Sequence, residues 1–318
     1  MKKNKTNIEI YEQAAKNLGI TTELVQSSPS THSLLITYKE KFYLASASTP
    51  GFYPEVRRWN AHFSSSKLLT QKILKRFGYK VVSSEAIRHA DFSSLHQLDA
   101  KLRQLDLKYP ILIKPDMGLR GQGIALADTL VQLKKIANEK FQRGEDFMLQ
   151  PILNQNEYRI LIVNYEVVLM HSKQNPHIVG DGVSTIAQLL SEIKKSKKDE
   201  TFIKYEHKLH KTKASSVLKK GTFFEYHLTK KPTSDYYQTS QIPAVIKKWT
   251  LKLAKTINAP VIGIDVFIPG TFADTSTYTI IELNSNPGLN YLPTYCNDET
   301  TAINIFEKVL RDYFGIKK

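Results

Sequence analysis

Short apolar segments of strand character alternate with helical segments along most of the 318 residues of this chain. The segments predicted as strands are 33–39, 41–48, 80–87, 109–116, 124–127, 147–153, 158–164, 166–174, 260–270 and 278–286. The segments predicted as helices are 8–18, 64–79, 95–105, 128–141 (opened by Asp128), 181–195, 242–257 and 299–314. This alternation predicts an α/β architecture, and the length suffices for two or three subdomains with a substantial core.

Composition excludes several other classes of protein. Apolar residues make up 41% of the chain and charged residues 24%, which is ordinary for a folded globular protein. The single cysteine, Cys296, excludes an intramolecular disulfide and a cysteine-rich zinc site. No apolar run approaches the length of a membrane span, and the first residues lack the apolar core of a signal peptide. A cytoplasmic protein without a membrane partner is therefore expected.

The formal net charge of +15 predicts an anionic partner, which could be nucleic acid, an acidic polymer or a nucleotide phosphate. Much of the excess lies in 191–220, where lysines far outnumber acidic residues. Such a run is usually a solvated helix face or a loop. Because no nucleic-acid motif accompanies the charge, nucleic acid is not the expected partner.

The segment "TIIELNSNPGLNYL" (279–292) ends a predicted strand with two polar side chains. Side chains alternate along a strand, so Glu282 and Asn284 share one face and lie about 7 Å apart. Two oxygen donors at this spacing can reach one or two hard cations. The alternative is a strand that ends in a polar turn, since Asn, Pro and Gly are common turn residues. From this segment alone, the turn is favoured.

A glycine-rich stretch follows the predicted strand that ends near Lys114. Gly118, Gly121 and Gly123 lie within six residues and are followed by a second strand. Glycines of this kind allow backbone amides to close on an anion, and the lysine supplies positive charge. The spacing is not that of a Walker loop, and an ordinary hairpin turn is the alternative.

The order of these segments resembles that of the ATP-grasp superfamily of carboxylate–amine ligases. After the lysine and the glycine-rich hairpin come "MLQPI", "NEYRILIV", "GIDVFI" and "IIELNSNPG". Within the superfamily, "HIVGDGVSTIAQLL" is most similar to cyanophycin synthetase and to the ligase half of bifunctional glutathione synthetases. The resemblance implies an α/β ATP-grasp fold with ATP held between two α+β lobes. Its domains would be a small N-terminal subdomain at 1–63 and an ATP-grasp domain at 64–318, with lobes at 64–145 and 146–318.

The resemblance also implies the residues that hold ATP. Lys67 and Lys114 match the two phosphate-binding lysines, and Lys173 matches a third basic residue that reaches the phosphates. Without the resemblance, Lys67 is an exposed helix lysine.

The adenosine part of ATP has its own implied contacts. Gln150, Pro151 and Ile152 match the hinge that binds adenine through its backbone. Glu157 matches a carboxylate on the ribose hydroxyls, and the alternative for Glu157 is a polar residue that precedes a strand.

Asp265, Glu282 and Asn284 match the magnesium ligands of the superfamily, and manganese is an alternative ion. A strand such as "VIGIDVFI" would not otherwise bury a lone carboxylate, because an uncompensated buried charge is costly. A cation relieves that cost, and ATP brings magnesium with it. With Asp265 included, the metal site is favoured over a capped turn or an ion pair.

One loop departs from the pattern of the two most similar families. They carry an arginine and then Ser-Thr-Gly-Gly, whereas alignment from Gly221 places His227 at the arginine and Asp235–Tyr236 at the glycines. Lys230 or Lys231 is an alternative source of the missing charge. The segment 226–236 is predicted to close over the reacting phosphoryl group if the chain is an active ligase.

Two function classes follow. The first is an ATP-dependent ligase that joins an amino-acid or peptide carboxylate to an amine through an acyl phosphate, with release of ADP and phosphate. The second is a degenerate ATP-grasp module that binds nucleotide without ligase activity. The lysines and the metal triad favour the ligase, and the altered loop favours the module. A homodimer is compatible with the sequence, which does not name the substrates.

Overall fold

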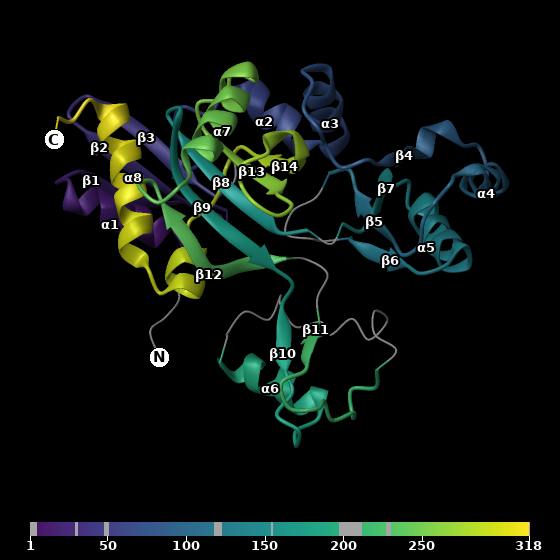
Figure 1. Cartoon of the computed structure of the whole chain (residues 1–318). Coiled ribbons are helices and arrows are strands. Elements are labelled where there is room, and N and C mark those ends of the chain that lie inside the picture. The colour runs from purple at the N-terminus through teal and green to yellow at the C-terminus, as the bar shows by residue number, and fades with distance from the viewer. Residues whose placement is uncertain are drawn as a thin grey trace. The chain divides into compact units, whose positions relative to one another are not determined.

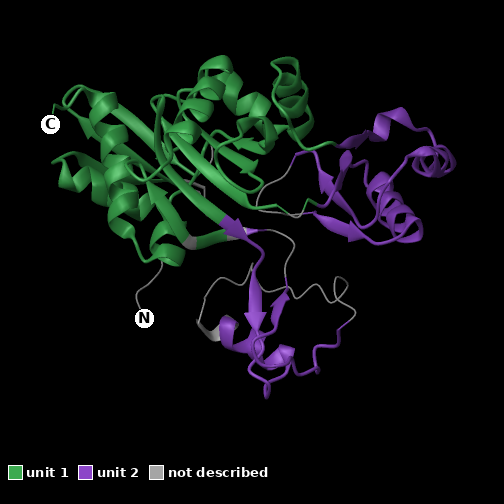
Figure 2. Cartoon of the chain, viewed as in Figure 1, with its two compact units in different colours: residues 1–83, 153–172, 232–318 green, residues 84–152, 173–231 purple. Residues whose placement is uncertain are grey.

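The computed structural model describes residues 5–28, 31–47, 51–117, 123–153, 155–196, 212–226 and 230–317. The chain divides into two compact units, each assembled from segments that are distant in sequence (Figure 2). Unit 1 comprises 1–83, 153–172 and 232–318, and unit 2 comprises 84–152 and 173–231. The domain boundaries predicted from the sequence, after residues 63 and 145, remain predictions.

Unit 1 is built on a five-stranded sheet with the strand order β12-β9-β8-β13-β14 (Figure 1). These strands are β8 (Glu157–Val163), β9 (Glu166–Gln174), β12 (Lys231–Gln238), β13 (Ile262–Phe267) and β14 (Thr279–Asn284). Asn164 and Tyr165 join β8 to β9 and both have positive φ, the backbone geometry that suits a tight two-residue hairpin. Strand β8 pairs antiparallel with β13, which pairs antiparallel with β14.

Two hydrophobic cores cover the opposite faces of this sheet. Ile160 and Ile162 of β8 pack in one core with residues of α7, whereas Leu161 and Val163 pack in the other with residues of α1 and α8. Successive side chains of a strand point to opposite faces, so β8 contributes to both cores. The helices are α1 (Asn7–Asn17), α2 (Arg58–Ser65), α3 (Lys67–Arg76), α7 (Ala244–Thr256) and α8 (Glu299–Phe314).

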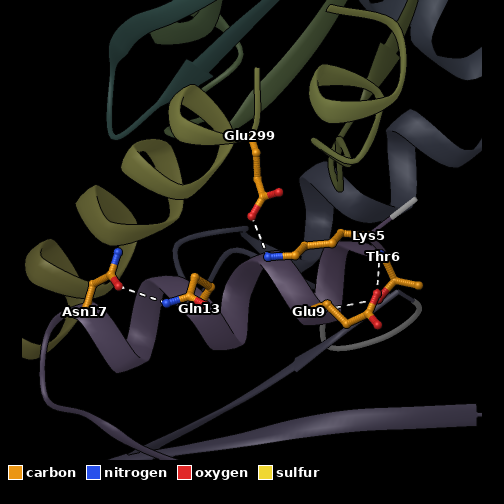
Figure 3. A network of polar contacts seen from close by, with 6 residues as sticks. All are labelled: Lys5, Thr6, Glu9, Gln13, Asn17 and Glu299. Atoms are coloured by element: carbon orange, nitrogen blue, oxygen red, sulfur yellow. Dashed lines mark hydrogen bonds and ion pairs between the residues drawn. The ribbon is translucent and has the colours of Figure 1, made fainter. Parts of the chain in front are cut away.

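The N-terminal segment shares its core with the C-terminal helix. An antiparallel sheet of β1 (Thr21–Ser28), β2 (Thr31–Tyr38) and β3 (Lys41–Ser46) buries Leu34 and Ile36 against the core that contains Phe306 of α8. The first turn of α1 is closed by a capping box, in which the Thr6 amide donates to Glu9 and the Glu9 amide donates to the Thr6 hydroxyl (Figure 3). Lys5 pairs with Glu299 at the start of α8 (Figure 3). The chain's two ends are therefore joined within unit 1.

Unit 2 contains a four-stranded sheet with the order β4-β7-β5-β6 and a separate small sheet of β10 and β11. The larger sheet packs with α4 and α5 around a core that includes Ile113 and Leu149. The smaller sheet packs with α6 around Ile178 and Ile186. The elements are β4 (Glu85–Ile87), α4 (Leu95–Gln104), β5 (Ile111–Pro115), β6 (Ala125–Ala127), α5 (Leu130–Gln142), β7 (Phe147–Pro151), β10 (His177–Val179), α6 (Ile186–Ser196) and β11 (Phe223–Glu225).

Several elements differ from those predicted. Thr129, and not Asp128, caps α5, because the Thr129 side chain accepts the Gln132 amide. Strand β12 occupies 231–238, where the sequence predicted a loop over the reacting group. Elements β1, α2, β10 and β11 were not predicted, since their segments are short or lack a regular apolar period.

Candidate functional site

Three neighbouring strands of unit 1 place charged residues in one row. Arg159 of β8 pairs with Asp265 of β13, which in turn pairs with Glu282 of β14. Directly paired residues of antiparallel strands point to the same face of a sheet. The register shifts after Asp265, so that Val266 pairs with Ile280 and Ile281 is the extra residue. A bulge at this position is typical of strands that aim side chains into a functional site.

Arg159 binds Asp265 with both ends of its guanidinium group. The Arg159 Nε donates to Asp265 Oδ1 at 2.6 Å, and Nη2 donates to Oδ2 at 2.7 Å. Nη2 also lies 3.6 Å from Glu282 Oε1. The side chain of Asp265 is only 2% exposed, whereas that of Glu282 is 37% exposed. A guanidinium therefore already compensates the buried charge that the sequence assigned to a metal ion, and Arg159 was not among the predicted site residues.

Arg159 is the positively charged member of the row. Burial by itself lowers the pKa of Arg159, but the Asp265 carboxylate outweighs burial and raises the pKa above its ordinary value, with a smaller contribution from Glu282. Arg159 is consequently cationic at every working pH. Arg159 contacts both carboxylates of the row, and Glu282 is the more exposed of the two.

Asn284 extends the row by one step along β14. It lies two residues after Glu282 and pairs with Gly263 of β13. A Cβ atom at Gly263 would lie 3.6 Å from the Asn284 Cβ and 3.3 Å from the Pro287 Cβ, so glycine leaves room for both. The Asn284 Oδ1 accepts a hydrogen bond from the Asn286 amide at 3.0 Å.

The donor set fits a hard divalent cation. In the parts of the chain that the structure describes, no group of three or more His, Cys, Asp or Glu side chains is arranged to hold a metal. The candidate ligands are instead two carboxylates and one amide oxygen, from Asp265, Glu282 and Asn284. Magnesium is commonly held by one or two carboxylates, with phosphate oxygens and water completing its shell. The set suits an ion that arrives with a nucleotide better than a permanent structural metal.

Tyr291 and His171 are further residues near this row. Tyr291 packs against His171 with ring centroids 4.5 Å apart and the ring planes tilted by 49°, and its buried hydroxyl has no hydrogen-bond partner among the described residues. Burial raises the pKa of Tyr291, the Asp265 charge adds to this, and the positive charge of Arg159 opposes it. Tyr291 is therefore a neutral phenol, and its sequence context gave no signal for a place beside Asp265.

Two of the predicted ATP-binding residues belong to unit 1. Lys67 is the first residue of α3, directly after Ser66, whose side chain accepts the Leu69 amide. Glu157 is the first residue of β8 and is buried, with 8% of its surface exposed. Lys67 lies in the helix expected for it, whereas Glu157, expected just before a strand, is the first residue of that strand. Their contacts with a nucleotide remain predictions.

Other predicted ATP-binding residues belong to unit 2. Lys114 lies in β5, and the β5–β6 hairpin that follows it is present as predicted. Gln150 is buried in β7 opposite Leu112, Pro151 ends that strand, and the next residue, Ile152, is 46% exposed.

The remaining predicted residues are only partly described. Gly123 has φ +72°, a conformation that favours glycine. Gly118, Gly121 and His227 lie outside the described residues. Lys173 is the penultimate residue of β9, Lys230 is half-buried, and Lys231 begins β12.

Within the described ranges, the chain has no helix that combines the length and the apolar character needed to cross a membrane.

The chain has the mixed α/β fold of the ATP-grasp ligases, as the sequence predicted. It superimposes on a solved bifunctional glutathione synthetase from Pasteurella multocida with a TM-score of 0.55 and 17% identity, over 96% of this chain and 43% of that one. In sequence, it is distantly similar to the glutathione biosynthesis bifunctional protein GshAB of Streptococcus agalactiae, with 24% identity over 263 residues. That alignment covers 74% of this chain and 33% of GshAB, so the chain spans about a third of the length of this relative.

The ATP-grasp ligase PsnB, solved with a precursor variant, Mg and ADP, aligns with a TM-score of 0.44 and 11% identity over 79% of this chain and 59% of PsnB. No family model matches the sequence. The likeness to glutathione synthetases is thus confirmed as distant similarity, and the likeness to cyanophycin synthetase remains a prediction.

Proposed function

We propose that the chain is an ATP-dependent carboxylate–amine ligase that forms an amide or peptide bond through an acyl phosphate, with release of ADP and phosphate. The observation that carries this proposal is the row of Arg159, Asp265 and Glu282 on three paired strands, extended by Asn284. The distant similarity to GshAB supports the same reaction class. The substrates proposed are an amino-acid or peptide carboxylate and an amine.

The acidic end of the row would hold the metal. Asp265, Glu282 and Asn284 are the proposed ligands of magnesium or manganese, which would neutralise phosphate charge and orient the reacting phosphoryl group when bound. Glu282 is the more accessible of the two carboxylates and would provide the first contact for the ion. Asp265 keeps its bond to Arg159 on one side and has lone pairs for a second partner.

Arg159 is proposed to position Asp265. A guanidinium held by two hydrogen bonds does not reorganise during a reaction, so it keeps that carboxylate in place. Because the charge of Arg159 is paired with Asp265, the positive charge near the reacting phosphoryl group is proposed to come from the bound ion and from other basic residues. His227, Lys230 and Lys231 remain proposed as additional catalytic groups, and Lys67, Lys114, Lys173, Gln150 and Glu157 as nucleotide contacts.

The test is ADP release in the presence of MgATP, screened over amino acids and dipeptides as carboxylate and amine donors. A substrate pair should raise ADP release well above the rate with MgATP alone. Glu282→Gln should then lower turnover on the order of 100-fold or more, because lost metal coordination costs several kcal/mol. It is a cleaner variant than Asp265→Asn, which also breaks the buried pair with Arg159.

A matched control is available in the same unit. Glu166 lies on β9 and pairs with Lys308 at 3.0 Å, so Glu166→Gln removes a carboxylate of the same sheet remote from the row. This control should retain turnover. Equal turnover in Glu282→Gln and Glu166→Gln would remove the metal assignment.

The alternative function is a nucleotide-binding module without ligase activity. One observation favours it: both oxygens of Asp265 already accept bonds from Arg159, so a metal must share or displace them. Calorimetric titration with MgADP distinguishes the two functions. Binding of MgADP together with no substrate-dependent ADP release would establish the module.

A further inference from the structure

The loop that follows the proposed metal strand is attached to the N-terminal part of unit 1. Asn286 lies two residues after Asn284, and its Oδ1 accepts the Phe52 amide at 2.8 Å. Its Nδ2 makes two longer bonds, to the Ala47 carbonyl at 3.4 Å and the Ser46 carbonyl at 3.5 Å. One side chain thus connects the end of β14 with a loop more than 230 residues earlier in the chain.

The same residue also contacts the proposed metal ligand directly. The backbone amide of Asn286 donates to Asn284 Oδ1 at 3.0 Å. This oxygen is the atom that would face a cation. A hydrogen bond to Oδ1 fixes which end of the amide is presented and holds its rotamer, while the second lone pair stays available. The position of this donor depends on the Asn286 side chain, which the N-terminal loop holds in place.

Gly51 lies close to the side chain of Asn286 and has an unusual backbone conformation. Gly51 has φ +105°, and a Cβ atom there would lie 3.2 Å from Asn286 Oδ1 and 3.3 Å from its Cγ. Any other residue at position 51 would have a strained backbone, and its Cβ atom would crowd the side-chain amide of Asn286. The close approach therefore requires glycine on one side and a short amide on the other.

We propose that Asn286 is a positioning residue, through which the N-terminal residues 46–47 and 51–52 orient Asn284 for metal binding. This inference rests on the proposed function and adds the N-terminal segment to the machinery of the site. Partners that orient metal ligands commonly contribute 10–100-fold to metal affinity, so the effect should be measurable.

The loop that follows β14 has a second contact with the N-terminal part of the chain, and this contact serves as the matched control. Asn7, in the first turn of α1, accepts the amides of Leu289 and Asn290 at 2.6 and 2.8 Å. These contacts hold the far end of the loop and do not reach Asn284. Asn7→Ala should therefore lower the free energy of unfolding without weakening metal binding.

The experiment measures binding of Mn²⁺ in the presence of ADP, by the loss of the free Mn²⁺ signal in electron paramagnetic resonance. The variants are Asn286→Ala, Gly51→Ala, both together, and Asn7→Ala, each with its urea unfolding curve. Asn286→Ala and Gly51→Ala should each weaken Mn²⁺ binding about tenfold. The double variant should be no weaker than the poorer single variant, because both act on one contact.

The outcomes separate this inference from the proposed function. Wild type that binds no Mn²⁺ with ADP would overturn both. If wild type binds and Glu282→Gln does not, but Asn286→Ala binds normally, only the positioning role is wrong. Equal weakening in Asn286→Ala and Asn7→Ala at equal loss of stability would likewise reduce Asn286 to a structural residue.

Discussion

Arg159 is the residue of the candidate site that the sequence did not predict. The carboxylate of Asp265 was predicted to need a cation, and that physical argument was right, but the cation in the structure is a guanidinium. The same argument applies to Arg159 itself, since a lone arginine in "EYRILIV" also requires a partner. Pairing the two needs the register of β8 against β13, which joins residues 106 positions apart.

The pair of Arg159 and Asp265 should contribute to the stability of the protein. Arg159→Met leaves the buried Asp265 charge without its partner, which should lower the free energy of unfolding by about 3–5 kcal/mol. If Asp265 also binds the metal, MgADP should stabilise this variant by more than it stabilises wild type, because the ion then supplies the missing compensation. Urea unfolding with and without MgADP measures both quantities. Equal stabilisation of the two proteins would show that Asp265 does not contact the ion.

Elements with a strong apolar period were predicted closely, and polar ones were not. The helix predicted at 299–314 and the strand predicted at 166–174 have those same bounds in the structure. Strand β12, with the sequence "KPTSDYYQ", has no apolar alternation and is a strand because it pairs beside β9. Likewise, the contacts of Asn7 and Asn286 with distant loops have no local signal.

Gly180 of the "VGDG" segment lies in close contact with a second backbone segment. A Cβ atom at Gly180 would lie 2.4 Å from the Lys219 carbonyl oxygen and 2.6 Å from the Leu218 Cβ. Gly180 also donates to Thr222 and accepts from Gly221, both at 2.8 Å. The backbone at Gly180 is thus held against another backbone segment, which explains why glycine is needed there.

Gly180→Ala should therefore destabilise the small β10–β11–α6 part by about 1–3 kcal/mol, because two of the three opposing atoms are backbone oxygens, which cannot move aside. Hydrogen exchange should show faster exchange of the α6 amides, such as that of Leu189. The control is Gly144→Ala, at a positive-φ glycine with open space around it, which should leave α6 unchanged. Unaltered α6 exchange in Gly180→Ala would contradict the steric explanation.

At the scale of the whole molecule, the net charge of +15 concerns the choice of partner. The two units were recovered only from the structure, because each unit is assembled from separated segments, and no composition change marks their limits. The positive charge is likewise distributed, with lysines on α7 as well as in 191–220. Distributed charge attracts polyanions without selecting among them.

The last prediction concerns nucleic acid. If the charge only attracts polyanions, a random oligonucleotide should bind with a dissociation constant in the non-specific range of about 10⁻⁴–10⁻⁶ M at physiological salt, and binding should weaken steeply as salt rises. Fluorescence anisotropy measures this at several salt concentrations.

Two variants that remove equal charge decide whether the lysine-rich segment is special. One replaces Lys213, Lys219 and Lys220 with glutamine, and the other replaces Lys247, Lys248 and Lys252 of α7. Non-specific attraction scales with the phosphates neutralised, so both variants should weaken binding by similar amounts and flatten the salt dependence similarly. Binding that is nanomolar in wild type and lost only in the first variant would identify a nucleic-acid site in the lysine-rich segment, and the anionic partner would then not be the nucleotide alone.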